Sequence, residues 1–138
     1  MKILVLNGPN LNRTGRREPN IYGQQTMEEM LSDLRKCFAE DEILYFQSNC
    51  EGCIIDRLQA AEDEGVEGIV LNAGAYTHTS VALHDCIRSI SVPVVEVHIS
   101  NIYAREEFRH RSLISAACKG VVCGFGMKSY ELAIRALC

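Results

Sequence analysis

The sequence has no long hydrophobic segment and no recognisable targeting signal. No apolar stretch approaches the about 20 residues that a helix needs to cross a bilayer. The chain opens with a short apolar run at residues 2–6, which lacks the basic region, the long hydrophobic region and the small-residue cleavage site of a secretory signal. We therefore expect a cytoplasmic protein without a membrane partner.

An excess of positive charge is also absent. The 138 residues include 14 Lys and Arg against 18 Asp and Glu, which gives a formal net charge of −4. The electrostatic signature of a nucleic-acid-binding protein is therefore missing. The sequence has no internal repeat, low-complexity tract or linker either. A chain of this length can bury one core but is too short to divide readily into two, so we expect a single domain over residues 1–138.

The cysteines do not form the pattern of a disulfide framework. There are seven of them, an odd number scattered through apolar segments, which is typical of reduced thiols. Cys50 and Cys53 form a C-x-x-C motif, a spacing found in zinc and redox sites. Because no second pair and no suitably spaced histidines complete a tetrahedral zinc site, we expect no metal.

Short β-branched runs alternate with longer segments of helical period. The runs typical of buried parallel strands are residues 3–7, 43–48, 68–72, 92–98 and 120–123. The expected helices are residues 26–39, 51–64, 80–89, 105–117 and 128–137, the fourth of them short. This alternation predicts an α/β protein with a doubly wound, five-stranded parallel sheet.

Two of the helix starts carry capping signals. Thr26 and Glu29 have the spacing of a capping box, and Ser48 and Glu51 have the same spacing before the second helix. The apolar residues of the first helix recur every three or four positions: Met27, Met30, Leu31, Leu34 and Phe38. This stripe is expected to pack on the sheet.

Polar segments follow three of the predicted strands. They are residues 7–12 after the first strand, 72–78 after the third and 98–101 after the fourth. Any one of them could be an ordinary solvated loop. In an open parallel sheet, however, ligands bind beyond the carboxyl ends of the strands, so three such segments at one edge predict a binding site.

Four segments resemble the signatures of type II dehydroquinases: residues 7–12, 15–23, 72–80 and 96–101. Residues 47–49 and 120–133 agree with the same family, so the resemblance spans nearly the whole chain. It implies a flavodoxin-like fold with strand order 2-1-3-4-5 and a mobile lid over roughly residues 13–24. It also implies dehydration of 3-dehydroquinate to 3-dehydroshikimate, in the shikimate or quinate pathway, without metal or organic cofactor. The usual assembly would be a dodecamer built from four trimers.

The chemistry of this elimination needs a base for the α-proton, stabilisation of the enolate and an acid for the departing hydroxyl. By resemblance Tyr22 is the base, and nearby positive charge from Arg17 would favour its anion. Asn10 matches a residue that holds a water against the enolate oxygen. His98 matches the acid, and Glu96, two residues earlier on the same strand face, matches the carboxylate that orients it.

The resemblance also implies a set of substrate contacts. The backbone N–H groups of Ile99 and Ser100 match a carboxylate-binding pair. Asn72, His78 and Arg109 match ligands for the substrate hydroxyls. Asp85 matches a carboxylate that reaches the site of a neighbouring subunit, whereas Arg105 is expected to be structural or to lie at an interface.

Other functions remain as alternatives. A flavin carrier needs a phosphate loop of small residues after the first strand, and a phosphoacceptor receiver needs acidic residues there; residues 8–11 provide neither. A type I dehydroquinase uses a lysine Schiff base, and no lysine follows a predicted strand. A homologue that binds the ligand without catalysis remains possible, because fold does not establish function.

Overall fold

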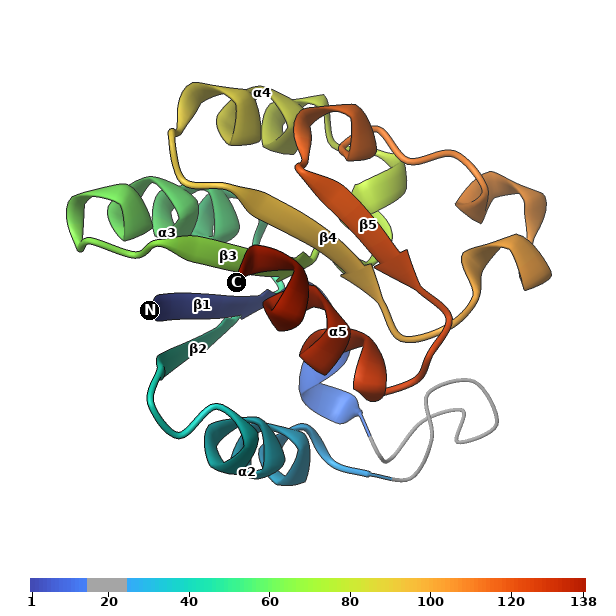
Figure 1. Cartoon of the computed structure of the whole chain (residues 1–138). Helices are drawn as coiled ribbons and strands as arrows, with labels where there is room; N and C mark the ends of the chain where they lie inside the picture. Colours follow the sequence, from blue (N-terminus) through green and yellow to red (C-terminus); the bar gives the residue numbers. More distant parts are fainter. Residues whose placement is uncertain (15–24) are drawn as a thin grey trace.

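A computed structural model describes residues 1–14 and 25–138. Its centre is a five-stranded, all-parallel sheet in the order β2-β1-β3-β4-β5 (Figure 1). The strands are β1 (Lys2–Asn7), β2 (Glu42–Gln47), β3 (Gly68–Asn72), β4 (Val94–His98) and β5 (Gly120–Cys123). The expected α/β class and strand order 2-1-3-4-5 are confirmed.

Helices cover both faces of the sheet (Figure 1). They are α2 (Met27–Cys37), α3 (Glu51–Asp63), α4 (Val81–Ser89) and α5 (Lys128–Leu137). Alternate residues of β1 supply the two cores: Ile3 and Val5 pack with α2 and α5, whereas Leu4 and Leu6 pack with α3 and α4. This period-two alternation explains why nearly every residue of the central strands is apolar. Within the described residues, no helix has both the length and the apolarity required to span a membrane.

The first predicted helix forms as its sequence indicates. Thr26 is the N-cap of α2, and its hydroxyl accepts a hydrogen bond of 3.2 Å from the backbone N–H of Glu29. The predicted apolar stripe is buried against the sheet, with Met30 and Leu34 each less than 5% exposed. The capping prediction and the packing prediction for α2 are both confirmed.

The capping prediction for α3 is wrong. The N-cap of this helix is Cys50, not Ser48. The Ser48 hydroxyl instead accepts a 3.0 Å hydrogen bond from the backbone N–H of Cys50. Serine bonds readily to a backbone N–H two residues ahead, and such a turn competes with a capping role.

The predicted short helix at residues 105–117 is also wrong. The chain instead forms separate 3-10 turns, η3 (Ile102–Ala104), η4 (Glu107–Arg109) and η5 (Ser115–Ala117). Ser112 explains part of the interruption, because its hydroxyl accepts hydrogen bonds from the backbone N–H groups of Ile114 and Ser115. Such local side-chain bonds give the backbone an alternative to a continuous helix.

The loops after β1 and β3 pack against each other through their backbones. The Gly8 N–H donates a 2.7 Å hydrogen bond to the Asn72 carbonyl. A Cβ atom added at Gly8 would lie 2.5 Å from the Ala73 carbonyl oxygen. Only glycine permits this approach, which joins two of the three polar segments at the sheet edge.

Replacing Gly8 by alanine is therefore expected to lower the free energy of unfolding by about 1–3 kcal/mol, the usual cost of overpacking a tight site. Gly120→Ala is the matched control, because no atom lies within 4 Å of its added Cβ. Urea unfolding of both variants measures the difference. An equal stability of Gly8→Ala and the parent would show that the two loops separate without cost.

Candidate active site

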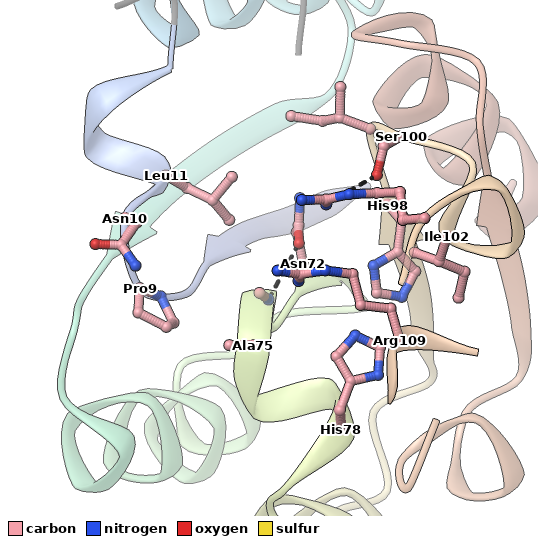
Figure 2. Close-up of a pocket in the computed structure, with 13 residues that line it drawn as sticks. Pro9, Asn10, Leu11, Asn72, Ala75, His78, His98, Ser100, Ile102 and Arg109 are labelled. Carbon is pink, nitrogen blue, oxygen red and sulfur yellow. Dashed lines mark hydrogen bonds between the residues drawn. The ribbon is translucent and has the colours of Figure 1, made fainter. Parts of the chain in front are cut away.

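A cleft opens at the carboxyl edge of the sheet, beyond β1, β3 and β4 (Figure 2). Its volume is about 590 Å³, including the part open to solvent. The lining residues come from the three polar segments and from residues 102–109, which include η3 and η4: Pro9, Asn10, Leu11, Asn72, Gly74, Ala75, His78, His98, Ile99, Ser100, Ile102, Arg105 and Arg109. The predicted meeting of these segments is thus present in the structure.

Most of the predicted site residues line this cleft. They are Asn10, Asn72, His78, His98, Ile99, Ser100 and Arg109. Glu96 lies behind His98 rather than in the lining. Asp85 is not among the lining residues; it lies on α4, with its side chain 73% exposed. Tyr22 and Arg17 lie outside the described residues, as does most of the predicted lid.

His98 and Glu96 form a buried ion-pairing dyad at the end of β4. The Nε2 atom of His98 lies 2.5 Å from a Glu96 carboxylate oxygen, and the two side chains are 6% and 0% exposed. Because Glu96 accepts at Nε2, the other ring nitrogen, Nδ1, is left for a ligand. The imidazolium form of a ring held in this way can donate a proton from Nδ1.

Two serines complete the environment of Glu96. The hydroxyls of Ser115 and Ser112 donate to its other carboxylate oxygen at 2.5 and 3.1 Å. Burial opposes ionisation of this carboxyl, but the hydrogen bonds from His98, Ser115 and Ser112 outweigh it and hold the pKa of Glu96 below its usual value. Glu96 is therefore a buried anion at neutral pH. No periodic pattern along the chain marks either serine as part of the site.

The lowered pKa of Glu96 predicts a pH-dependent contribution to stability. Ionised Glu96 stabilises the fold above the unfolded-state pKa of about 4.3, and this contribution disappears as the pH falls through the lower folded-state pKa. Glu96→Gln should cost about 2 kcal/mol at pH 7, the scale of hydrogen bonds to a charged group. Urea unfolding between pH 7 and pH 3 should show the gap between parent and variant shrinking towards low pH. A gap that is constant with pH would contradict an ionised Glu96.

His78 faces His98 across the cleft. The two rings are stacked, with centroids 6.3 Å apart (Figure 2). The Nδ1 atom of His78 lies 2.8 Å from the Arg111 carbonyl, which can only accept, so Nδ1 carries the proton. Burial, together with the charges of His98 and Arg109, lowers the pKa of His78. A neutral ring with protonated Nδ1 leaves Nε2 as an acceptor for a hydroxyl.

Asn72 is held from below by a buried polar network. Its amide donates to the Tyr130 hydroxyl at 3.0 Å, and Tyr130 in turn donates to the Asn7 side chain at 2.8 Å. Burial raises the pKa of Tyr130, so this phenol stays neutral and serves as a hydrogen-bond relay. The Asn72 side-chain oxygen accepts from the Gly74 N–H at 3.2 Å. These contacts fix the amide at the cleft floor, and Tyr130 could not have been assigned to this network from sequence spacing.

Asn10 stands on the opposite side of the cleft from His78 (Figure 2). Its φ angle is 70°, a left-handed conformation that asparagine tolerates better than most residues. Its backbone N–H donates to the Asn49 side chain at 2.9 Å. The Gln47 amide donates to both the Gly8 carbonyl and Asn49, at 3.1 and 3.2 Å. Hydrogen bonds thus hold the loop that carries Asn10 against the end of β2 and the residues that follow it.

Two arginines reach the cleft from the turns that replace the predicted fourth helix. Arg109, which was predicted as a ligand, is oriented by a 3.1 Å ion pair with Glu106. Arg105, which was expected to be structural or to lie at an interface, also lines the cleft, and its guanidinium donates to the Ser100 hydroxyl at 3.3 Å. Composition could not distinguish these side chains, because the segment holds three arginines.

Backbone donors are available beside His98. Within the described part of the chain, the N–H groups of Ile99 and Ser100 do not donate to another protein group. Adjacent unpaired N–H groups form a favourable site for an anion. Among these described residues there is also no cluster of three or more His, Cys, Asp or Glu side chains placed to hold a metal.

Together, the open parallel sheet and its edge cleft are those of an α/β enzyme with a carboxylate-backed histidine at the site. A family model described as Dehydroquinase class II matches residues 1–138. The chain therefore belongs to the class II dehydroquinase family, as its sequence motifs predicted.

Individual relatives agree with this assignment. The 3-dehydroquinate dehydratase of Rhizobium johnstonii is 58% identical over 137 residues, covering 98% of this chain and 94% of that protein. The 3-dehydroquinate dehydratase of Pelodictyon phaeoclathratiforme is 55% identical over 138 residues, covering 99% and 91%. The crystal structure of type II dehydroquinase from Butyrivibrio crossotus matches with a TM-score of 0.96 and 48% identity, covering 99% of this chain and 97% of that one.

Proposed function

We propose that this chain is a hydro-lyase that converts 3-dehydroquinate to 3-dehydroshikimate. The observation that carries the proposal is the buried His98–Glu96 dyad, which opens on a cleft at the sheet edge in a member of the class II dehydroquinase family. A protonated imidazole can deliver the proton that a leaving hydroxide needs. Relatives named 3-dehydroquinate dehydratase support this choice of substrate.

The reaction divides into two proton transfers. Tyr22, as the anion, removes the proton from the carbon next to the ketone, and the electron pair moves into the carbonyl to form an enolate. The enolate then expels the β-hydroxyl, which takes a proton from His98 and leaves as water. Asn10 stabilises the enolate oxygen through a water, and Arg17 favours the Tyr22 anion. Glu96 acts as a positioning residue, since its contact is with His98.

The contacts of the cleft fit the remaining groups of the substrate. The carboxylate binds the N–H groups of Ile99 and Ser100, beside the acid. The neutral Nε2 of His78 accepts from a ring hydroxyl, while Arg109 donates to another. Asn72 adds an amide whose orientation is fixed by Tyr130. No imine is formed, and no lysine is among the described residues of the cleft.

We further propose that Asp85 acts on the site of a neighbouring subunit in a dodecamer built from four trimers. Its exposed position on α4, away from the cleft of its own subunit, supports this role. The isolated protomer should then be a poor enzyme. Sedimentation measurements on the assay sample identify the active species, and full specific activity in a demonstrated monomer would contradict the role of Asp85.

The decisive experiment follows the conjugated enone of the product by ultraviolet absorbance. The protein is incubated with 3-dehydroquinate, and absorbance should rise in proportion to enzyme concentration. Borohydride added with the substrate should leave the activity intact, because there is no imine to trap. A protein that binds 3-dehydroquinate in calorimetry but never produces the enone would instead be the non-catalytic homologue.

A further inference from the structure

Cys50 and Cys53 lie together at the start of α3, outside the cleft lining. Cys50 is the N-cap and Cys53 lies in the first turn, and both are exposed free thiols. The Cys50 backbone is fixed by its 3.0 Å hydrogen bond to the Ser48 hydroxyl. Side chains at the N-cap and three residues further on are close enough to interact, as they do in a capping box.

The two thiols have different environments. The Cys50 sulfur lies over the first turn, 3.9 Å from the position of a Cβ built at Gly52. It makes no capping hydrogen bond. The backbone N–H and the thiol of Cys53 hold the pKa of Cys50 below its ordinary value, with a smaller contribution from the Gly52 N–H. The thiol of Cys50 in turn raises the pKa of Cys53.

We propose that Cys50 and Cys53 form a reversible dithiol–disulfide couple, in which Cys50 is the attacking thiol and Cys53 the resolving one. The oxidant is a small-molecule disulfide. The Cys50 thiolate attacks one of its sulfurs and releases the other as a thiolate. Cys53 then loses its proton and attacks the Cys50 sulfur, which releases the second thiolate. The two cysteines are oxidised by two electrons, and the small disulfide is reduced to two thiols.

This couple is joined to the cleft through Asn49, the residue before Cys50. The Asn49 side chain accepts from the Asn10 N–H at 2.9 Å, and its carbonyl accepts from the Tyr76 hydroxyl at 2.8 Å. Closing a disulfide at Cys50 changes the backbone that positions both contacts. We therefore expect oxidation to lower kcat by up to about a hundredfold, the cost of misplacing a catalytic group by roughly 1 Å.

The other cysteines lack this combination of exposure and contact. Cys86 is buried, and burial raises the pKa of its thiol. Burial likewise raises the pKa of Cys118 to about 12. Cys37 is exposed on α2 and interacts with Arg135 at 3.4 Å, which makes it a suitable control for a surface thiol outside a C-x-x-C pair.

The chemical test uses reduced protein equilibrated with mixtures of reduced and oxidised glutathione, followed by thiol alkylation and peptide mass spectrometry. The parent should form a Cys50–Cys53 disulfide that dithiothreitol reverses. Cys53→Ser should stop at glutathione bound to residue 50, whereas Cys50→Ser should form neither product. Cys37→Ser should behave as the parent does. Free thiols at 50 and 53 under conditions that oxidise Cys37 would overturn the couple, and faster alkylation of Cys53 than of Cys50 would overturn the assigned roles.

The kinetic test compares the reduced and oxidised forms in the enone assay, and this arm depends on the proposed function. Oxidised parent should lose kcat and regain it with dithiothreitol, while Cys50→Ser should keep its kcat under the same oxidation. Oxidised parent with unchanged kcat would overturn the coupling to Asn49. An inactive reduced parent would refute the dehydratase function instead, and the mass-spectrometric result would stand apart from it.

Discussion

Replacing His98 by alanine is expected to lower kcat for 3-dehydroquinate dehydration by about a hundred- to ten-thousand-fold, the usual contribution of a positioned general acid. The hydroxyl would then have to leave without a proton from the Nδ1 side of the ring. Because the dyad is buried, the substitution would also leave Glu96 as an unpaired anion, so the melting temperature must be measured alongside the rate. Binding of the product 3-dehydroshikimate, measured by calorimetry, separates loss of chemistry from loss of the site.

Glu96→Gln is the matched variant, because it keeps the ring and removes the negative charge behind it. Loss of the carboxylate that orients His98 should lower kcat with little change in KM, because Glu96 contacts His98 and does not line the cleft. A purely structural Glu96 would alter stability without this selective loss of kcat. If His98→Ala retained kcat within about threefold of the parent, a difference worth under 1 kcal/mol of activation free energy, His98 could not be the acid.

The sheet was predictable because its pattern repeats over many residues. Each strand is an apolar run of ordinary length, and α2 carries both a cap and a stripe, so several independent signals agree. The failures came where one polar side chain decides the outcome. Ser48 bonds to the Cys50 N–H rather than capping α3, and Ser112 closes local turns that prevent a continuous helix near Arg109. Hydropathy patterns carry no information about such bonds.

The site was predictable in part, and for a different reason. The rule that ligands bind at the carboxyl edge of a parallel sheet was enough to bring Asn10, Asn72 and His98 together. It could not identify residues that lie outside the cleft lining and hydrogen-bond to a site residue. Examples are Ser115, which donates to Glu96, and Tyr130, which accepts from Asn72. These contacts join residues 19 and 58 positions apart, and only the folded chain brings them together.

Replacing Tyr22 by phenylalanine is expected to lower kcat by about a hundred- to ten-thousand-fold at every pH, because phenylalanine cannot accept the α-proton. Tyr22 lies outside the described residues, so this prediction rests on its motif and on the chemistry that the cleft still requires. None of the described residues that line the cleft is proposed as the base. A test of Tyr22 therefore also needs a variant whose effect depends on pH.

Arg17→Ala provides that dependence. A phenol with an unperturbed pKa near 10 is ionised in only about one molecule in a thousand at pH 7. If Arg17 favours the Tyr22 anion, its removal should lower kcat at neutral pH by up to about a thousandfold, and activity should recover as the pH approaches 10. Tyr22→Phe should show no such recovery. Arg13 is an exposed residue of the 3-10 turn η1 (Leu11–Arg13), and Arg13→Ala should keep the parent profile. An Arg17→Ala profile that parallels the parent at all pH values would mean that Arg17 contributes binding rather than activation of the base.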